Sequence, residues 1–352
     1  MRSPEIRLAP MENDSSSTFS VTRAGDTPSE TPDYQFLITF FVFLTQYFWI
    51  VPVVLGVPGN VLSIFVANRK HNRALSPCIY MKAMAVADML VLIQQAIGLP
   101  LLYTDIGAQI VYRRDIIHKC HVYIYFTCAM LSGFFLAEMS VDRLIAVRFP
   151  MAAPRICTTS RAIKTVIITA IFGIIFNFQL PFVMVYVKDP VSGAEALLFD
   201  VPNNKAVEIF ASLSQTLLGT VFPFIIIFGS NVIIIIAVKS ASEKRAKMSE
   251  GQGQGNRKEE QHLTRMLIFV SCAYVVSSLP FRLYILLIDI PEIGWIYNMD
   301  DTYWNLRYAV QGFFVFDVWL FNYAINFYLY CIGGGVKYRR DAKDVCKELV
   351  SC

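Results

Sequence analysis

Charged residues are scarce in this chain. Asp, Glu, Lys and Arg make up 16% of the 352 residues, whereas hydrophobic residues make up 55%. A soluble globular domain has charged residues at about a quarter of its positions. The scarcity of charge therefore argues against a soluble protein, although the length alone would suit two soluble domains.

The chain also lacks the patterns of common catalytic and metal sites. It has no phosphate-binding glycine-rich loop and no Gly-x-Ser-x-Gly sequence. Its four His residues show no metal-ligand spacing, and its eight Cys residues form no Cys-x-x-Cys pair. We therefore expect a protein that is not an enzyme, that carries no organic cofactor and that does not bind nucleic acid.

The few charges leave seven long apolar stretches. Each is long enough for the helix of about 20 residues that crosses a bilayer, and a helix satisfies its own backbone hydrogen bonds in lipid. The sequence thus predicts an all-α membrane protein, a seven-transmembrane helix bundle. The predicted spans are 34–68, 83–104, 120–141, 165–187, 209–238, 266–288 and 308–336.

Basic residues gather in alternate connections between these spans. If the N-terminus is outside, the inner connections hold 21 of the 31 Lys and Arg residues and the outer connections hold 9. The positive-inside rule then predicts a multi-pass plasma-membrane protein with an extracellular N-terminus and a cytoplasmic C-terminus. The net charge of +4 divides into −7 outside, +13 inside and −2 within the spans, which suits an anionic inner leaflet.

The chain is expected to have three parts. Residues 1–35 are polar and are predicted to be a disordered extracellular tail, in which Asn13 begins a glycosylation sequon. Residues 36–336 form the transmembrane domain, and residues 337–352 form a short amphipathic cytoplasmic helix and tail. In the outer connection after span four, two short apolar runs, 183–187 and 196–201, flank a turn at 189–193, which favours a β-hairpin.

Polar and proline residues recur within the spans in a defined order, and burying the polar ones in lipid is costly. They are Gly59-Asn60, Asp88, Asp142-Arg143, Phe222-Pro223-Phe224, Ser278-Leu279-Pro280-Phe281, and Asn322 followed by Asn326-Phe327-Tyr328-Leu329-Tyr330. In this order they resemble the signature positions of rhodopsin-like (class A) G protein-coupled receptors, over roughly residues 40–348. The Asn326-Phe327 pair, where that family usually has Asn-Pro, resembles invertebrate neuropeptide receptors of the FMRFamide type.

The resemblance implies a receptor that activates a heterotrimeric G protein and also binds arrestin. Asp142 would hold Arg143 in an inactive pose, and Arg143 would turn toward the G protein on activation. Glu260 is either a second acidic partner of that arginine or an ordinary solvated charge. Asn326 and Tyr330 complete the implied activation switch.

The resemblance also implies a buried sodium site, because an oxygen-rich cluster around one carboxylate suits a hard cation. The alternative is a protonated or water-bridged Asp88 with no ion. The implied ligands of an allosteric sodium ion are Asp88, Ser132, Asn322 and Asn326.

Several positions depart from the family pattern. Ser278 stands where a tryptophan is usual in span six, and Asn231 where a tyrosine is usual in span five. Residues 182–208 contain no cysteine, so we expect no intramolecular outer disulfide, and Cys120 is either free or pairs between chains. Cys346 is either palmitoylated, as a second anchor, or an ordinary thiol.

The ligand class follows only in outline. Tyr125 occupies the position of the aspartate of aminergic receptors, and Leu320 that of the retinal-binding lysine of opsins, so both classes are disfavoured. Arg282 contacts the ligand, pairs with Asp317 or forms hydrogen bonds with other polar side chains. By matched position, the expected pocket residues are Gln95, Tyr125, Ala129, Gln215, Arg282 and Phe316.

The outer connection before span seven is acidic, and such a field would attract a cationic ligand, although it also serves solubility. We therefore expect an extracellular neuropeptide as the ligand. The alternatives are a lipid or small chemosensory ligand and, in another class, a seven-helix transporter or channel.

Overall fold

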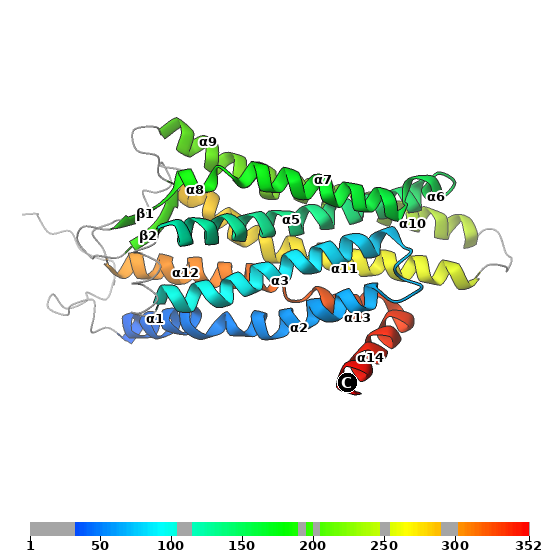
Figure 1. The fold of residues 1–352 in the computed structure, drawn as a ribbon, viewed down its shortest axis with the longest axis horizontal. Coiled ribbons are helices and arrows are strands. Elements are labelled where there is room, and N and C mark those ends of the chain that lie inside the picture. Colours follow the sequence, from blue (N-terminus) through cyan, green and yellow to red (C-terminus); the bar gives the residue numbers. More distant parts are fainter. Residues whose placement is uncertain are drawn as a thin grey trace, which may run out of the picture.

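The computed structural model describes residues 32–103, 115–188, 195–199, 205–246, 254–289 and 302–351. These residues form a long bundle of helices with one small hairpin (Figure 1). In chain order the elements are α1 (Pro32–Phe43), η2 (Leu44–Phe48), α2 (Ile50–Ala67), α3 (Ser76–Tyr103), α5 (Asp115–Arg148), α6 (Ala153–Ile156), α7 (Thr159–Asn177), α8 (Leu180–Val183), β1 (Met184–Lys188), β2 (Glu195–Phe199), α9 (Lys205–Thr216), η3 (Leu217–Val221), α10 (Phe222–Ala246), α11 (Gln254–Asp289), α12 (Thr302–Phe321), α13 (Asn326–Gly333) and α14 (Gly335–Ser351).

The predicted spans lie mainly on these helices, but residues 184–187, at the end of the predicted fourth span, belong to β1. In the described part of the chain, five helical segments are long and apolar enough to cross a membrane, and α12 with α13 forms a sixth, bent one. The predicted span 266–288 lies in α11, which contains the apolar segment Ile268–Phe281. The helices extend beyond the apolar stretches, because a charged residue ends an apolar stretch but does not end a helix.

Two predicted boundaries were wrong at the ends of the domain. Residues 32–35 were placed in the disordered tail, but α1 begins at Pro32. A proline at the first helical position and an acid, Asp33, in the first turn both favour a helix start there. The C-terminal helix begins at Gly335 rather than at residue 337.

The predicted hairpin is present. Strands β1 and β2 pair antiparallel, with Met184 opposite Phe199 and Lys188 opposite Glu195. The strands start and end within two residues of the predicted runs, and the turn between them lies outside the described residues. The hairpin lies at one end of the bundle, and α14 lies at the other (Figure 1). We call these the outer and inner ends, after the predicted orientation.

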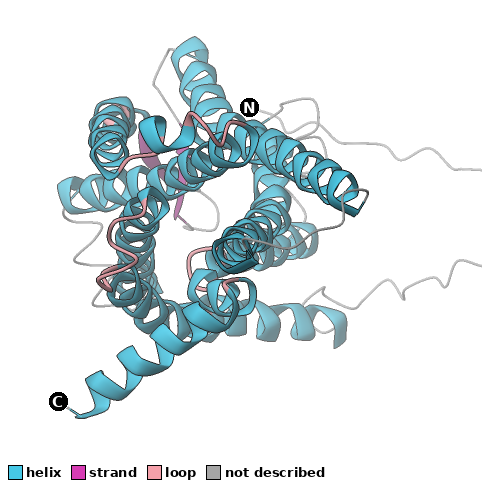
Figure 2. Ribbon diagram, turned by 90° about the vertical axis from the view of Figure 1, so that its right-hand side faces the viewer, coloured by secondary structure: helices cyan, strands magenta, loops and turns pink. Residues whose placement is uncertain are grey.

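Seen along its axis, the bundle is a ring of helices from which α14 runs outward (Figure 2). Helix α5 contacts α3, α7, α10 and α11. The outward faces are apolar, as on α7, where Ile168 and Ile175 are 67% and 68% exposed. An apolar surface of this kind is expected where lipid, not water, surrounds the protein.

The seventh span is bent by 49° between α12 and α13, although it has no proline at the break. The backbone N–H groups of Asn322 and Ala324 bond only three residues back, at 3.0 Å each. From α2, the Asn60 amide donates to the carbonyl oxygen of Tyr323 at 2.8 Å. A side chain inserted into a helix ladder is a recognised cause of a kink, so Asn60 stabilises the bend that a proline would otherwise favour.

Candidate functional site

A polar layer crosses the middle of the bundle. Asp88 of α3 is completely buried. Ser132 of α5 donates its hydroxyl to one Asp88 oxygen at 2.5 Å, and the amide of Asn326 in α13 donates to the other oxygen at 2.8 Å. We call Asp88, Ser132 and Asn326 the polar layer. A buried carboxylate is tolerated only when its oxygens are paired, so this layer joins three helices at one level.

Two hydrophobic clusters lie on either side of the polar layer. The inner cluster includes Ala87, Phe135 and Tyr330, and the outer cluster includes Val91, Cys128 and Tyr323. In each of the three helices the polar residue therefore separates inner-cluster from outer-cluster positions. The polar layer marks the boundary between the outer and inner halves of the bundle.

The four residues predicted for sodium are all buried. No hydrogen bond joins the side chain of Asn322 to Asp88 among the described contacts, so only three of the four are brought together directly. The donor set is nevertheless all oxygen with one negative charge, because Asn326 uses its nitrogen toward Asp88 and keeps its amide oxygen. The described residues contain no group of three or more His, Cys, Asp or Glu residues that could hold another kind of metal. The set thus fits a hard monovalent cation.

The inner end carries a buried ion pair. Arg143 donates from Nη2 to Asp142 Oδ2 at 2.7 Å, and the two side chains are 13% and 7% exposed. Ser76, the first residue of α3, donates its hydroxyl to the same Asp142 oxygen at 2.9 Å. The sequence predicted the pairing, whereas Ser76 was missed because it lies 66 residues away.

The loop before α7 also holds this ion pair. Cys157 donates its thiol to the backbone oxygen of Asp142 at 3.4 Å. Burial, and then the nearby Asp142 carboxylate, raise the pKa of the Cys157 thiol to about 11, so the sulfur keeps the proton that it donates. Arg143 itself has one unused hydrogen-bond donor, because its buried Nε has no hydrogen-bond partner.

The remaining predicted switch residues lie on α13 and α11. Tyr330 is 1% exposed, its hydroxyl has no hydrogen-bond partner, and its ring packs edge-on against Tyr338 of α14, with centroids 6.0 Å apart. Glu260 and Arg282 lie in α11, but their side chains are outside the described part of the chain. The Asn13 sequon lies wholly outside the described residues.

At the inner end, α13 and α11 approach each other very closely. A Cβ atom at Gly333 of α13 would lie 2.5 Å from the Cα of Met266 in α11. Only a glycine allows this contact, because real Cβ atoms do not approach other atoms so closely. The inner end of α11 is therefore packed against α13 in this structure.

Three of the predicted pocket residues belong to one aromatic cluster in the outer half. Tyr125, Ala129 and Phe316 all lie in or against the outer hydrophobic cluster. The centre of their packing is Trp319, which stacks on Phe281 at 4.6 Å between ring centroids. We call Tyr125, Phe281, Phe316 and Trp319 the aromatic cluster. The sequence analysis did not single out Trp319. A usable signal was present, because span seven contains a tryptophan whereas span six lacks its usual one.

The two predicted pocket glutamines differ in their surroundings. Gln95 is buried in the outer half of α3. Gln215 of α9 donates its amide to Asn177 Oδ1 of α7 at 2.8 Å, and Asn177 in turn donates to the Gly173 carbonyl at 2.8 Å. The amide donor of Gln215 is therefore used in a contact between helices.

Two further acidic side chains lie within the spans, Glu138 partly buried and Asp317 buried. Glu138 of α5 accepts a hydrogen bond from Thr169 of α7, which gives this residue a place in the α5–α7 contact. Asp317 of α12 is 1% exposed, and its Oδ2 has no hydrogen-bond partner.

We predict that Gln215→Ala lowers the stability of the ligand-free protein. The variant leaves the Asn177 oxygen buried without its donor, which costs about 1–3 kcal/mol. Thermal unfolding in detergent measures this loss, and Gln311→Ala, on an exposed position of α12, is the matched control. Equal midpoints for the two variants would mean that the Gln215–Asn177 bond contributes nothing to stability.

Comparison with known proteins agrees with this arrangement. The thyrotropin-releasing hormone receptor of Mus musculus is 30% identical over 175 residues, which are 48% of this chain and 42% of that receptor. The growth hormone secretagogue receptor type 1 of Mus musculus is 26% identical over 239 residues, 65% of this chain and 62% of that receptor. The matches thus span less than half of the first relative and about three fifths of the second.

The family model described as 7 transmembrane receptor (rhodopsin family) matches residues 59–328. This range begins at Gly59 of α2 and ends in α13, and it includes the polar layer, the Asp142–Arg143 ion pair and the aromatic cluster. The chain therefore belongs to the rhodopsin family of seven-transmembrane receptors.

Proposed function

We propose that this protein is a plasma-membrane receptor that binds an extracellular ligand and activates a heterotrimeric G protein. The observation that carries the proposal is the buried Asp142–Arg143 ion pair at the inner end. An arginine that is paired with an adjacent acid at a helix end can exchange that acid for an acceptor on a bound protein. The N-terminus is then extracellular and α14 cytoplasmic, in agreement with the charge asymmetry of the connections.

Activation is a shift between two states, toward the state that the ligand binds more tightly. In the structure the inner end of α11 packs on α13 at Gly333, which closes the inner end. Pro280 interrupts the hydrogen bonding of α11 and supplies a hinge about which its inner half moves outward. That movement exposes Arg143 to the G protein, and Arg143 then leaves Asp142.

We predict that Arg143→Ala abolishes ligand-driven nucleotide exchange on a co-expressed G protein, because the variant lacks the guanidinium group that contacts the G protein. The matched control is Arg148→Ala, which removes an exposed arginine from the last turn of the same helix and retains most of the exchange. Normal exchange by Arg143→Ala at an equal surface level would overturn the mechanism.

We propose a short peptide as the ligand. The two relatives are named as receptors for a releasing hormone and for a growth hormone secretagogue. The aromatic cluster gives apolar anchoring, and Gln95, buried in the outer half of α3, offers an amide partner for a peptide backbone. A lipid or small chemosensory ligand is the second candidate, since the aromatic cluster would suit it as well.

We predict that Phe316→Ala lowers the potency of the activating ligand by about tenfold or more, because the variant loses a central aromatic contact. A screen of amidated peptides, lipids and odorants for G protein activation identifies the ligand first. Phe314→Ala is the control, because Phe314 lies on the same helix and is 46% exposed. Activation by lipids alone would replace the peptide proposal, and equal potency of the two variants would remove Phe316 from the pocket.

We further propose that Asp88, Ser132, Asn322 and Asn326 bind an allosteric sodium ion. The buried negative charge and the all-oxygen donors support this reading. The ion would stabilise the closed state, because it ties α3, α5 and α13 together in the polar layer.

We predict that sodium raises the thermal unfolding midpoint of the wild-type protein relative to choline at the same ionic strength, since a ligand of the native state stabilises it. Asp88→Asn keeps the shape but removes the charge, and the sodium effect should disappear. Ser132→Ala, which keeps the carboxylate, should weaken the effect in part. A sodium effect that persists in Asp88→Asn would place the ion elsewhere.

Arrestin binding, an acyl chain on Cys346 and a glycan on Asn13 stay predictions. Cys346 is exposed on α14 as a free thiol, so it is accessible to an acyl transferase. Cys120 is likewise an exposed free thiol at the outer part of α5.

A further inference from the structure

A run of glycines joins α13 to α14. Gly333 ends α13, Gly334 follows it and Gly335 begins α14, and we call these residues the glycine joint. A Cβ atom at Gly333 would lie 2.5 Å from the Cα and 2.9 Å from the backbone nitrogen of Met266 in α11. Both of these atoms are backbone, so a rotation of the Met266 side chain would not make room. The end of α13 is thus a docking surface for the backbone of α11, and one methyl group would block it.

The second glycine of the joint lets α14 pack back against α13. The Gly334 N–H donates to the carbonyl oxygen of Tyr330 at 2.8 Å, and a Cβ atom at Gly334 would lie 2.8 Å from the Cβ of Tyr338 in α14. The rings of Tyr330 and Tyr338 pack edge-on, with centroids 6.0 Å apart. The end of α13 and the start of α14 are therefore packed as one unit.

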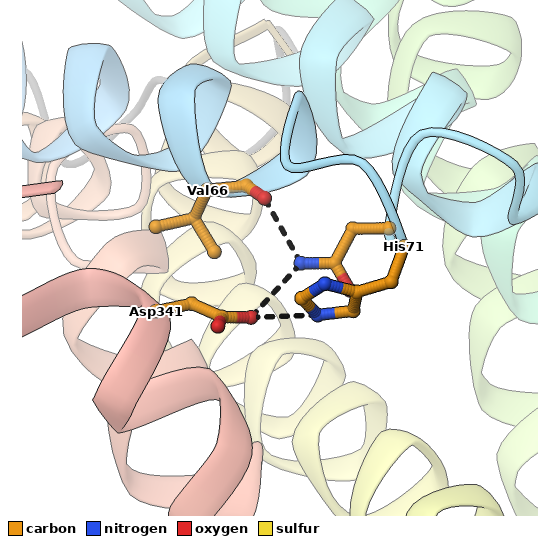
Figure 3. A network of polar contacts seen from close by, with 4 residues as sticks. Val66, His71 and Asp341 are labelled. Carbon is orange, nitrogen blue, oxygen red and sulfur yellow. Dashed lines mark hydrogen bonds and ion pairs between the residues drawn. The ribbon is translucent and has the colours of Figure 1, made fainter. Parts of the chain in front are cut away.

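The loop after α2 anchors α14. Asp341 of α14 is 6% exposed, and its Oδ2 lies 2.9 Å from His71 Nε2 and accepts a hydrogen bond from the Asn72 amide at 3.2 Å (Figure 3). The Asn72 amide also donates to the carbonyl oxygen of Val66 at 2.9 Å. Through these contacts the Asp341 carboxylate ties α14 to the last turn of α2.

Apolar packing adds to this attachment. A buried cluster joins α2, α13 and α14, and it consists of Val66, Phe327, Ala342 and Val345. Arg69 also donates to Glu348 at 2.8 Å, but the Glu348 side chain is 63% exposed, so this ion pair contributes little. We call the Asp341 contacts and the buried cluster the α14 anchor. The anchor holds the end of α13 in place through the glycine joint.

Helix α11 can yield where α13 cannot. Pro280 lies inside α11 and donates no backbone hydrogen bond, so the helix can bend there. Met266 lies on the inner side of Pro280 and is buried with Tyr330 in the inner hydrophobic cluster. A clash at Gly333 would therefore be relieved by movement of α11, because the anchor holds α13.

We propose that this arrangement is an autoinhibitory contact. Gly333 allows the inner half of α11 to dock on α13, and the α14 anchor keeps the docking surface in place, so the inner end stays closed without a ligand. The closed state is thus assigned to a backbone contact that is separate from the Asp142–Arg143 ion pair. The link of this contact to G protein activation rests on the proposed function, whereas the contact itself does not.

The test is Gly333→Ala in the full-length protein in detergent. The added methyl group overpacks the closed contact. Cys78 reports the opening, because it is 5% exposed and lies with Met266 in the inner hydrophobic cluster. Its alkylation by N-ethylmaleimide, followed by mass spectrometry, should be about tenfold faster than in the wild type, as the usual cost of overpacking implies. Cys128, which is 7% exposed in the outer cluster, should react at the wild-type rate, which shows that the outer half is folded.

The matched control is Gly229→Ala, because a Cβ atom at Gly229 of α10 would meet no neighbouring helix within 4 Å. Both substitutions replace a helical glycine by alanine, so they share the same gain in helix propensity. If Cys78 reacts no faster in Gly333→Ala than in Gly229→Ala, the proposal is overturned.

Basal nucleotide exchange on a co-expressed G protein is measured in the same variants. Gly333→Ala should raise it about tenfold without a ligand, since the open state becomes more populated. Faster alkylation of Cys78 with unchanged exchange supports the contact and contradicts the proposed coupling to the G protein. Unchanged alkylation with normal ligand-driven exchange contradicts the contact and leaves the proposed function standing.

Asp341→Ala tests the anchor and adds no bulk at the joint, so it serves even if Gly333→Ala does not fold. Alone, it should speed the alkylation of Cys78, because the docking surface is released. In the double variant with Gly333→Ala, the increase should be smaller than the product of the two single increases, because the released end of α13 yields to the methyl group. No effect of Asp341→Ala alone, or a full product in the double variant, would overturn the role of the anchor.

Discussion

The rest of the bundle depends on one buried carboxylate. Asp88 lies in an apolar interior where an unpaired charge would be very costly. Its two oxygens are satisfied by Ser132 and Asn326, which belong to two other helices. Three spans must therefore meet at one level and in one rotation. The two hydrophobic clusters then pack on either side of this layer, between helices whose level and rotation it fixes.

At the inner end, too, a buried acid is held by side chains from other parts of the chain. Arg143 is held by Asp142, and that acid is in turn held by Ser76 and by the backbone contact from Cys157. The pair is secured by elements on two sides, yet the Arg143 Nε remains without a partner. In the proposed mechanism, Arg143 stays paired in the closed bundle and binds an acceptor on the G protein when the inner end of α11 moves away from Gly333.

Much of this could be predicted from the sequence, because burial in lipid leaves a strong compositional signal. The seven stretches, the hairpin and the Asp142–Arg143 pair were all visible as patterns of neighbouring residues. The bend of span seven was not, since its cause is Asn60 on another helix. Gln215 was placed in the pocket by matched position, but its partner Asn177 lies 38 residues away. Helix ends were also misjudged, because a charged residue ends an apolar run without ending a helix.

The sequence by itself determined which segments enter the membrane, which end is basic and which polar residues are buried, because each of these follows from composition along the chain. Only the tertiary structure decided which buried polar groups satisfy each other. Asp88 and Asn326 are 238 residues apart, and His71 and Asp341 are 270 apart. Such pairs depend on the packing of helices, and a hydrogen bond has a direction and a length that no pattern of neighbouring residues records.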